Sequence, residues 1–161
     1  PTVRNERHVY VSRAEMLQIA KACQNRPTRA YIRIAFYSGM RLGEIERARI
    51  VGSNFVLDDT KNGDRRVVPI HPRIRCCLGY PAETRFKMGY HWRAAKLAVG
   101  HDELTFHDLR HSAASELINQ GVDLYTVGAV LGHRSAASTK RYAHLATDRL
   151  AEAIGKMGKR A

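Results

Sequence analysis

Apolar residues recur at helical spacing over most of the chain, which predicts a mainly helical protein. Ser12 and Glu15 have the spacing of a capping box, and the apolar residues Met16, Leu17, Ile19 and Ala20 follow at the positions of a buried helix face. A second helix is expected over about residues 28–38, before a stretch flanked by Gly39 and Gly43 interrupts it. Further helical stretches are expected over residues 44–48, 71–78, 84–99, 122–131, 135–143 and 147–157.

The pattern changes near the middle of the chain. Residues 55–57 and 65–70 read as two short strands, and Asn62-Gly63 lies between them. Asn-Gly between strand-like runs is a strong hairpin signal, while Pro69 indicates an edge position or the end of the second strand. The expected fold class is therefore α+β, mainly helical, with one small antiparallel β-sheet.

The most informative stretch is Thr105-Phe-His-Asp-Leu-Arg-His-Ser112. Thr105 and Asp108 have capping-box spacing, so a helix is expected to open here. His107 and Arg110 are three residues apart and share one face of its first turn, where free N–H groups and a partial positive charge suit an anion. Taken alone, the stretch is equally compatible with an ordinary basic helix start.

Charge narrows the class of partner. The 161 residues are sufficient for one domain, and the net charge of +12, with a pI near 10.1, favours a polyanion such as nucleic acid. An anionic membrane surface is the competing interpretation, but no apolar run approaches the ~20 residues of a spanning helix. The three cysteines, two of them adjacent, do not form a disulfide framework, which fits a reducing cytoplasm.

Five stretches in order carry a resemblance to a known family. They are residues 38–45, 60–70, 105–112, 131–135 and 139–144, and together they resemble the catalytic domain of the tyrosine recombinases, the phage integrase family of site-specific DNA recombinases. The resemblance implies that residues 12–161 are the catalytic domain and residues 1–11 a linker or arm. It also implies that the family's usual N-terminal DNA-binding domain is absent from this chain, which begins at Pro1 and is expected to be a fragment or a processed product. The segment 71–104 looks short for the family.

The resemblance implies a role for each candidate residue. Arg41 and Arg110 would clamp the scissile phosphate, because a guanidinium meets phosphate oxygens with a fixed, charged fork. Tyr142 would attack phosphorus and form a 3′-phosphotyrosyl link, and Lys61 would protonate the departing 5′ oxygen. The remaining candidates are the histidines His107 and His133, which would donate hydrogen bonds or handle the Tyr142 proton, and Glu44 and His111, which would support the others without touching the substrate.

The implied activity is the breaking and rejoining of double-stranded DNA by a tetramer on paired sites, without cofactor or metal, in a bacterial or phage-encoded protein acting in the cytoplasm at the nucleoid. Lys61 could instead be a plain charged residue on a hairpin tip. A type IB topoisomerase-like strand transferase or a non-catalytic DNA-binding domain are the alternatives for the whole chain. A metallohydrolase is a further rival, because His107 and His111 are four residues apart, as in zinc helices. Asp108 in place of the usual Glu and the adjacent Arg110 count against it.

Overall fold

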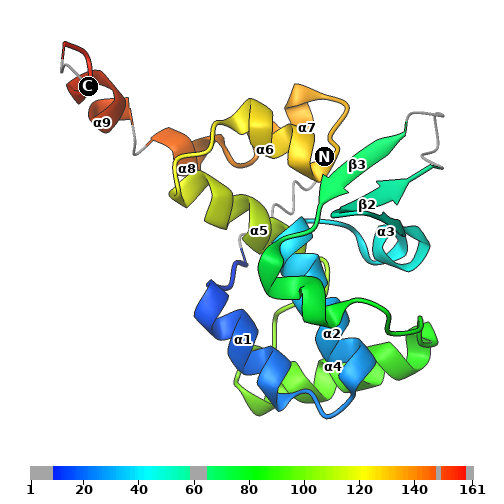
Figure 1. Cartoon of the computed structure of the whole chain (residues 1–161). Helices are drawn as coiled ribbons and strands as arrows, with labels where there is room; N and C mark the ends of the chain where they lie inside the picture. Colours follow the sequence, from blue (N-terminus) through cyan, green and yellow to red (C-terminus); the bar gives the residue numbers. More distant parts are fainter. Residues whose placement is uncertain (1–8, 59–64, 148–149, 159–161) are drawn as a thin grey trace, which may run out of the picture.

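The computed structural model of the chain, which describes residues 9–58, 65–147 and 150–158, is mainly helical, with one small sheet at the side of the helices (Figure 1). The strands are β1 (Arg49–Val51), β2 (Asn54–Leu57) and β3 (Arg66–Pro69), and a 3₁₀ helix, η1 (Pro72–Cys77), follows them. The α-helices of the described residues are α1 (Arg13–Ala22), α2 (Arg26–Ser38), α3 (Leu42–Arg47), α4 (Arg85–Ala98), α5 (Asp108–Asn119), α6 (Leu124–Leu131), α7 (Ala136–Lys140), α8 (Ala143–Thr147) and α9 (Leu150–Gly155). The expected fold class, mainly helical α+β with a small antiparallel sheet, is confirmed.

Local sequence explains the ends of the central helix. The Asn25 side chain accepts a hydrogen bond from the Thr28 N–H, so α2 begins at Arg26, two residues before the expected start, and Pro27 fits in its first turn. α2 ends at Gly39, whose φ of 65° is left-handed. A side chain there would also meet Leu131, because an added Cβ would lie 2.7 Å from Leu131 Cδ2. The chain can therefore turn sharply from α2 towards Arg41 only with glycine at this position.

The sheet is antiparallel in the order β1-β2-β3. Phe55 pairs with Val68 and both are buried, so the predicted pairing of these two strands is confirmed. The tip between them, which includes Lys61, lies outside the described residues. β1 was missed because its three residues are all exposed and show no apolar alternation.

Two apolar cores hold the helices together. The larger core lies around α2, which packs against α1, α3, α4, α5 and η1. The smaller core joins α5, α6 and the segment between α7 and α8, and it contains Ala114, Ile118, Val127, Leu131 and Tyr142. α9 lies apart from both in Figure 1. Throughout the described part of the chain, every helix is too short or too polar to span a bilayer.

Three helix predictions need correction. α5 begins at Asp108 rather than at Thr105, because the Asp108 carboxylate accepts hydrogen bonds from the Thr105 N–H and hydroxyl, both at 2.7 Å, and holds residues 105–107 in a turn. The helix expected over residues 135–143 is two short helices, α7 and α8, separated by a turn at Arg141 and Tyr142. The segment expected over residues 147–157 is helical only from Leu150 to Gly155 among its described residues.

Candidate active site

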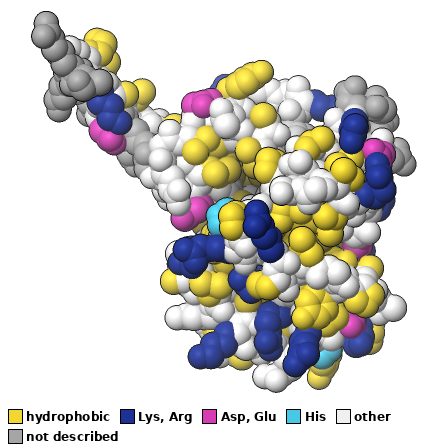
Figure 2. All heavy atoms as spheres, in the orientation of Figure 1, with side chains coloured by type: hydrophobic (Ala, Val, Ile, Leu, Met, Phe, Trp, Pro, Cys, Tyr) yellow, Lys and Arg dark blue, Asp and Glu magenta, His cyan; other side chains and the backbone are white. Residues whose placement is uncertain are grey.

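A cavity of about 1050 Å³ opens where α3, the sheet, the start of α5 and the α6–α7 junction meet. Its described lining includes seven arginines and two histidines but one acid, Glu44. The arginines are Arg41, Arg47, Arg65, Arg66, Arg85, Arg110 and Arg134, and the histidines are His107 and His133. Lys and Arg side chains are also more prominent than acidic ones on the face shown in Figure 2. Such a lining suits a polyanion far better than an apolar or cationic ligand.

Glu44 organises one wall of the cavity. Its Oε2 accepts a hydrogen bond from the Arg41 backbone N–H at 2.8 Å, and its Oε1 accepts one from Arg41 Nη1 at 3.0 Å. Burial raises the pKa of Glu44, but the Arg41 backbone hydrogen bond and the charges of Arg66, Arg110 and Arg41 outweigh burial and lower that pKa overall. Glu44 is therefore an anion that fixes the first turn of α3 and the base of the Arg41 side chain.

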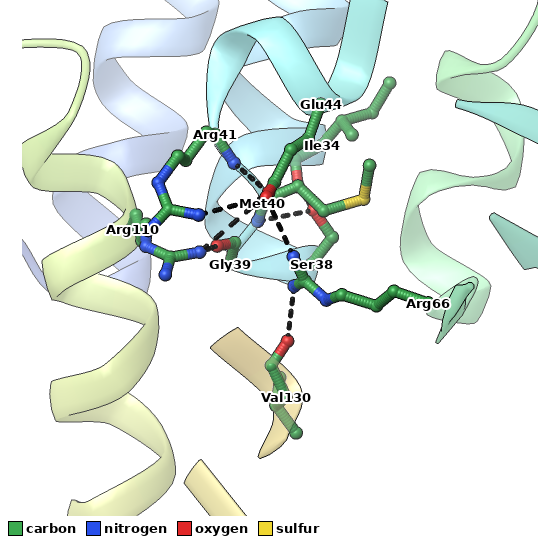
Figure 3. A network of polar contacts seen from close by, with 9 residues as sticks. All are labelled: Ile34, Ser38, Gly39, Met40, Arg41, Glu44, Arg66, Arg110 and Val130. Atoms are coloured by element: carbon green, nitrogen blue, oxygen red, sulfur yellow. Dashed lines mark hydrogen bonds and ion pairs between the residues drawn. The ribbon is translucent and has the colours of Figure 1, made fainter. Parts of the chain in front are cut away.

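Arg110 lies at the floor of the cavity and is only 2% exposed. Its Nη1 donates to the Gly39 carbonyl at 2.7 Å and lies 4.0 Å from Glu44 Oε2 (Figure 3). Its Nη2 is buried and has no hydrogen-bond partner. Burial, followed by the charge of Arg41, lowers the Arg110 pKa to about 10. A buried cation with an unused donor is costly by itself, which is the arrangement expected where an anionic ligand completes the site.

Arg66 is a cavity residue that sequence reasoning did not single out. It enters from β3, and its guanidinium donates to Glu44 at 3.0 Å and to the Val130 carbonyl at 2.6 Å. The signal that could have found it is strand alternation, since Arg66 lies two residues before the buried Val68 and therefore shares its face of β3.

The two histidines flank the arginines. His107 is the N-cap residue of α5. His133 follows the end of α6, and its Nδ1 shares a hydrogen bond with Thr139 Oγ1 at 2.8 Å. Burial, followed by the charge of Arg110, lowers the pKa of His107 and brings that of His133 to about 4. Both rings are therefore neutral at pH 7, and each has one N–H that can donate a hydrogen bond and one nitrogen that can accept one.

Tyr142 does not line the cavity. It is 1% exposed and packs in the smaller core, and its hydroxyl shares a 2.5 Å hydrogen bond with Nδ1 of His111. The His111 ring in turn lies 4.9 Å, centroid to centroid, from that of His107. Burial raises the pKa of Tyr142, and it lowers that of His111 to about 4 together with the charge of His107. The Tyr142 hydroxyl is therefore separated from the cavity by His111, whose ring lies next to the cavity residue His107.

The structure therefore brings together Arg41, Glu44, His107, Arg110 and His133 in one cavity. It places Tyr142 and His111 directly behind that cavity, while Lys61 lies outside the described residues and stays a prediction. No set of three or more His, Cys, Asp or Glu side chains in residues 9–58, 65–147 and 150–158 is arranged to hold a metal ion.

A mainly helical α+β domain with a cavity lined by arginines and neutral histidines has the charge and the hydrogen-bond donors that suit a phosphate group. Residues 82–149 match the model of the phage integrase family. The chain is 30% identical over 165 residues to the shufflon-specific DNA recombinase of Escherichia coli, covering 90% of this chain and 42% of the relative. It is 32% identical over 152 residues to a putative integrase of Pseudomonas phage Pf1, covering 88% and 45%. By these matches the chain is similar to the phage integrase family, the tyrosine recombinases, and it spans less than half the length of these two relatives.

Solved structures agree on the fold. The catalytic domain of bacteriophage HP1 integrase superposes with a TM-score of 0.75 at 21% identity, over 95% of this chain and 98% of that one. XerA recombinase gives 0.74 at 22% identity, over 100% of this chain and 68% of that one. XerH site-specific recombinase, bound to its difH substrate, gives 0.72 at 18% identity, over 94% and 55%.

Proposed function

We propose that this chain is the catalytic domain of a site-specific DNA recombinase, which breaks and rejoins DNA strands through a 3′-phosphotyrosyl intermediate. The observation that carries the proposal is the cluster of Arg41, Arg66 and Arg110 around Glu44, with His107 and His133 on the same cavity. Three guanidinium groups and one carboxylate leave a net charge of two positive units. A phosphodiester carries one negative charge that grows on its non-bridging oxygens during attack, and this cluster can stabilise it.

The proposed reaction needs no energy source. Arg41 and Arg110 hold the scissile phosphate, and the Tyr142 oxygen attacks phosphorus. The P–O5′ bond breaks as the tyrosyl P–O bond forms, so the bond energy is kept in the 3′-phosphotyrosyl link and a 5′-hydroxyl can later reverse the step. A neutral histidine, His107 or His133, accepts or stabilises the tyrosine proton, and Lys61 supplies one to the leaving 5′ oxygen.

Attack requires Tyr142 to leave the smaller core. We expect the backbone to move at the turn formed by Arg141 and Tyr142 between α7 and α8, because both helices are only five residues long. Moving Tyr142 breaks its hydrogen bond to His111, and DNA bound in the cavity offers the compensating contacts with phosphate.

Double-stranded DNA is the proposed partner. The net charge of +12 and the arginine-lined cavity support this, as does the capture of XerH with its DNA substrate. We also propose that residues 12–161 form one catalytic domain that follows a linker. The protein would act at the nucleoid and would assemble as a tetramer on paired DNA sites. The exposed apolar residues Leu150, Ile154 and Met157 around α9 support docking between protomers.

The test is capture of the covalent intermediate. The chain is incubated with nicked duplexes made from the DNA that flanks its gene, so that the cleaved end diffuses away and the adduct accumulates. Wild type should give a denaturation-resistant protein–DNA adduct, and Tyr142→Phe should give none while binding DNA with similar affinity. DNA binding without any wild-type adduct would favour a non-catalytic domain, and an adduct that persists in Tyr142→Phe would show that another residue is the nucleophile.

A further inference from the structure

One side chain physically joins the two walls of the cavity. Arg66 on β3 donates through Nη1 to Glu44 Oε1 at 3.0 Å and through Nη2 to the Val130 carbonyl at 2.6 Å (Figure 3). Its side chain is 13% exposed, so both hydrogen bonds are largely shielded from water. Glu44 belongs to α3 and Val130 to the last turn of α6, and these elements are far apart in the sequence.

Each end of this link reaches a residue of the proposed reaction. At one end, the Glu44 oxygen that accepts from Arg66 also accepts from Arg41 Nη1. At the other end, Val130 lies three residues before His133. The Arg66 guanidinium also packs against Gly132, where an added Cβ would lie 2.7 Å from Cζ, Nε and Nη1. The glycine allows this close approach, so Arg66 fixes both the end of α6 and the backbone that leads to His133.

Arg66 also contributes to the net charge of the cluster that the arginines form around Glu44. Glu44 forms ion pairs with Arg41 and Arg66 at 3.0 Å and with Arg110 at 4.0 Å. Without Arg66, one carboxylate would face two guanidinium groups, and the net charge offered to a phosphate would fall from two positive units to one. A lysine could replace the charge but not the fork that reaches two acceptors at once.

We propose that Arg66 is a positioning residue, which holds the Arg41–Glu44 wall and the His133 wall at the separation that a phosphodiester requires. It acts through Glu44 and the α6 end rather than by touching the reacting atoms. The inference rests on the proposed function for its kinetic consequence but not for its structural one. Misplacing a catalytic group by about 1 Å can cost ~10²-fold in rate.

The test compares Arg66→Lys, Arg66→Gln and a control, Arg49→Gln. Arg49 lies in the same sheet, pairs with Asp58 and does not line the cavity, so its loss removes the same charge from an exposed position. Single-turnover adduct formation is measured at saturating protein on the nicked duplexes, and affinity is measured separately. Both Arg66 variants should form adduct ~10²-fold more slowly, with affinity within ~3-fold of Arg49→Gln, which should match wild type in rate.

A second readout does not depend on activity. NMR titration of the His133 ring should show a pKa near 4 in wild type, and a higher one in Arg66→Gln because a neighbouring positive charge is removed. Arg66→Lys should keep the lowered His133 pKa and still cleave slowly, which separates geometry from charge. Arg66→Lys also retains the methylene stem and one hydrogen bond, so it remains a testable variant should Arg66→Gln not fold.

The outcomes are distinct. Cleavage at the wild-type rate by Arg66→Lys would overturn the positioning role, since the charge alone would then suffice. An unchanged His133 titration in Arg66→Gln would overturn the link to that wall. Absence of adduct in wild type would instead reject the proposed function, and the His133 titration would still report whether the Arg66 charge acts on the His133 wall.

Discussion

Acid should destabilise this fold through two histidines, His111 and His133. Both have a folded-state pKa of about 4 against an ordinary value of 6.5, chiefly because burial disfavours the imidazolium, with His107 and Arg110 respectively as the next cause. Each site binds a proton more readily in the unfolded chain than in the folded one. Stability is therefore fully present above pH 6.5 and is lost as the pH falls towards 4.

The size of the effect follows from the two pKa values. The gap between 6.5 and about 4 corresponds to roughly 3 kcal/mol for each histidine once the pH is below both values, and to roughly 2 kcal/mol at pH 5. Burial also lowers the pKa of His71 and His107, so these residues act in the same direction. A total loss of roughly 4 kcal/mol between pH 7.5 and pH 5 is large for a domain of this size.

Urea unfolding at pH 7.5 and pH 5.0, at equal ionic strength, measures this loss. His111→Gln removes one titrating group and keeps a hydrogen-bonding side chain beside Tyr142, so it should reduce the loss by roughly 2 kcal/mol. Equal acid sensitivity in wild type and His111→Gln would refute the assignment of this effect to His111.

Two further predictions concern the chemistry. Lys61→Ala should slow cleavage of ordinary DNA by ~10²–10⁴-fold, as expected for a lost general acid. A substrate with a 5′-thio leaving group, which needs no proton, should restore the rate of Lys61→Ala but not that of Arg110→Ala. If sulfur fails to rescue Lys61→Ala, Lys61 is a DNA-binding residue or a plain hairpin residue. Adduct formation should persist in excess EDTA, because guanidinium groups provide the charge stabilisation, whereas loss of cleavage that zinc or magnesium restores would favour a metal-dependent reaction.

The features of this structure that depend on residues close together in the sequence were predicted from the sequence. The Ser12–Glu15 capping box forms as expected, with the Glu15 carboxylate accepting from the Ser12 N–H at 2.6 Å. The β2–β3 pairing was predicted from two strand-like runs with Asn62-Gly63 between them. The motifs around Arg41, Arg110 and His133 were recognised from neighbouring sequence, and the fold brings these three residues to one cavity.

The features that were missed depend on contacts between distant segments. β1 is an exposed edge strand, so its residues carry no apolar pattern and only pairing with β2 defines it. Arg66 looks like one more basic residue beside a hairpin until Glu44 and the Val130 carbonyl are placed next to it. Likewise, residues 135–143 have helical spacing throughout, but burial of Tyr142 in the smaller core breaks them into α7 and α8.

The placement of Tyr142 links these observations to the proposed reaction. In the cavity, the positive charges of Arg41 and Arg110 would favour the phenolate and leave a reactive nucleophile exposed. In the smaller core, burial instead raises the pKa of Tyr142, so the hydroxyl stays protonated and shielded. Because Glu44 holds Arg41 and Arg66 through hydrogen bonds that do not involve Tyr142, the proposed phosphate site can form while the proposed nucleophile stays in the smaller core. In the proposed reaction, cleavage would require the turn between α7 and α8 to move, so reactivity would depend on a conformational change as well as on the charge of the site.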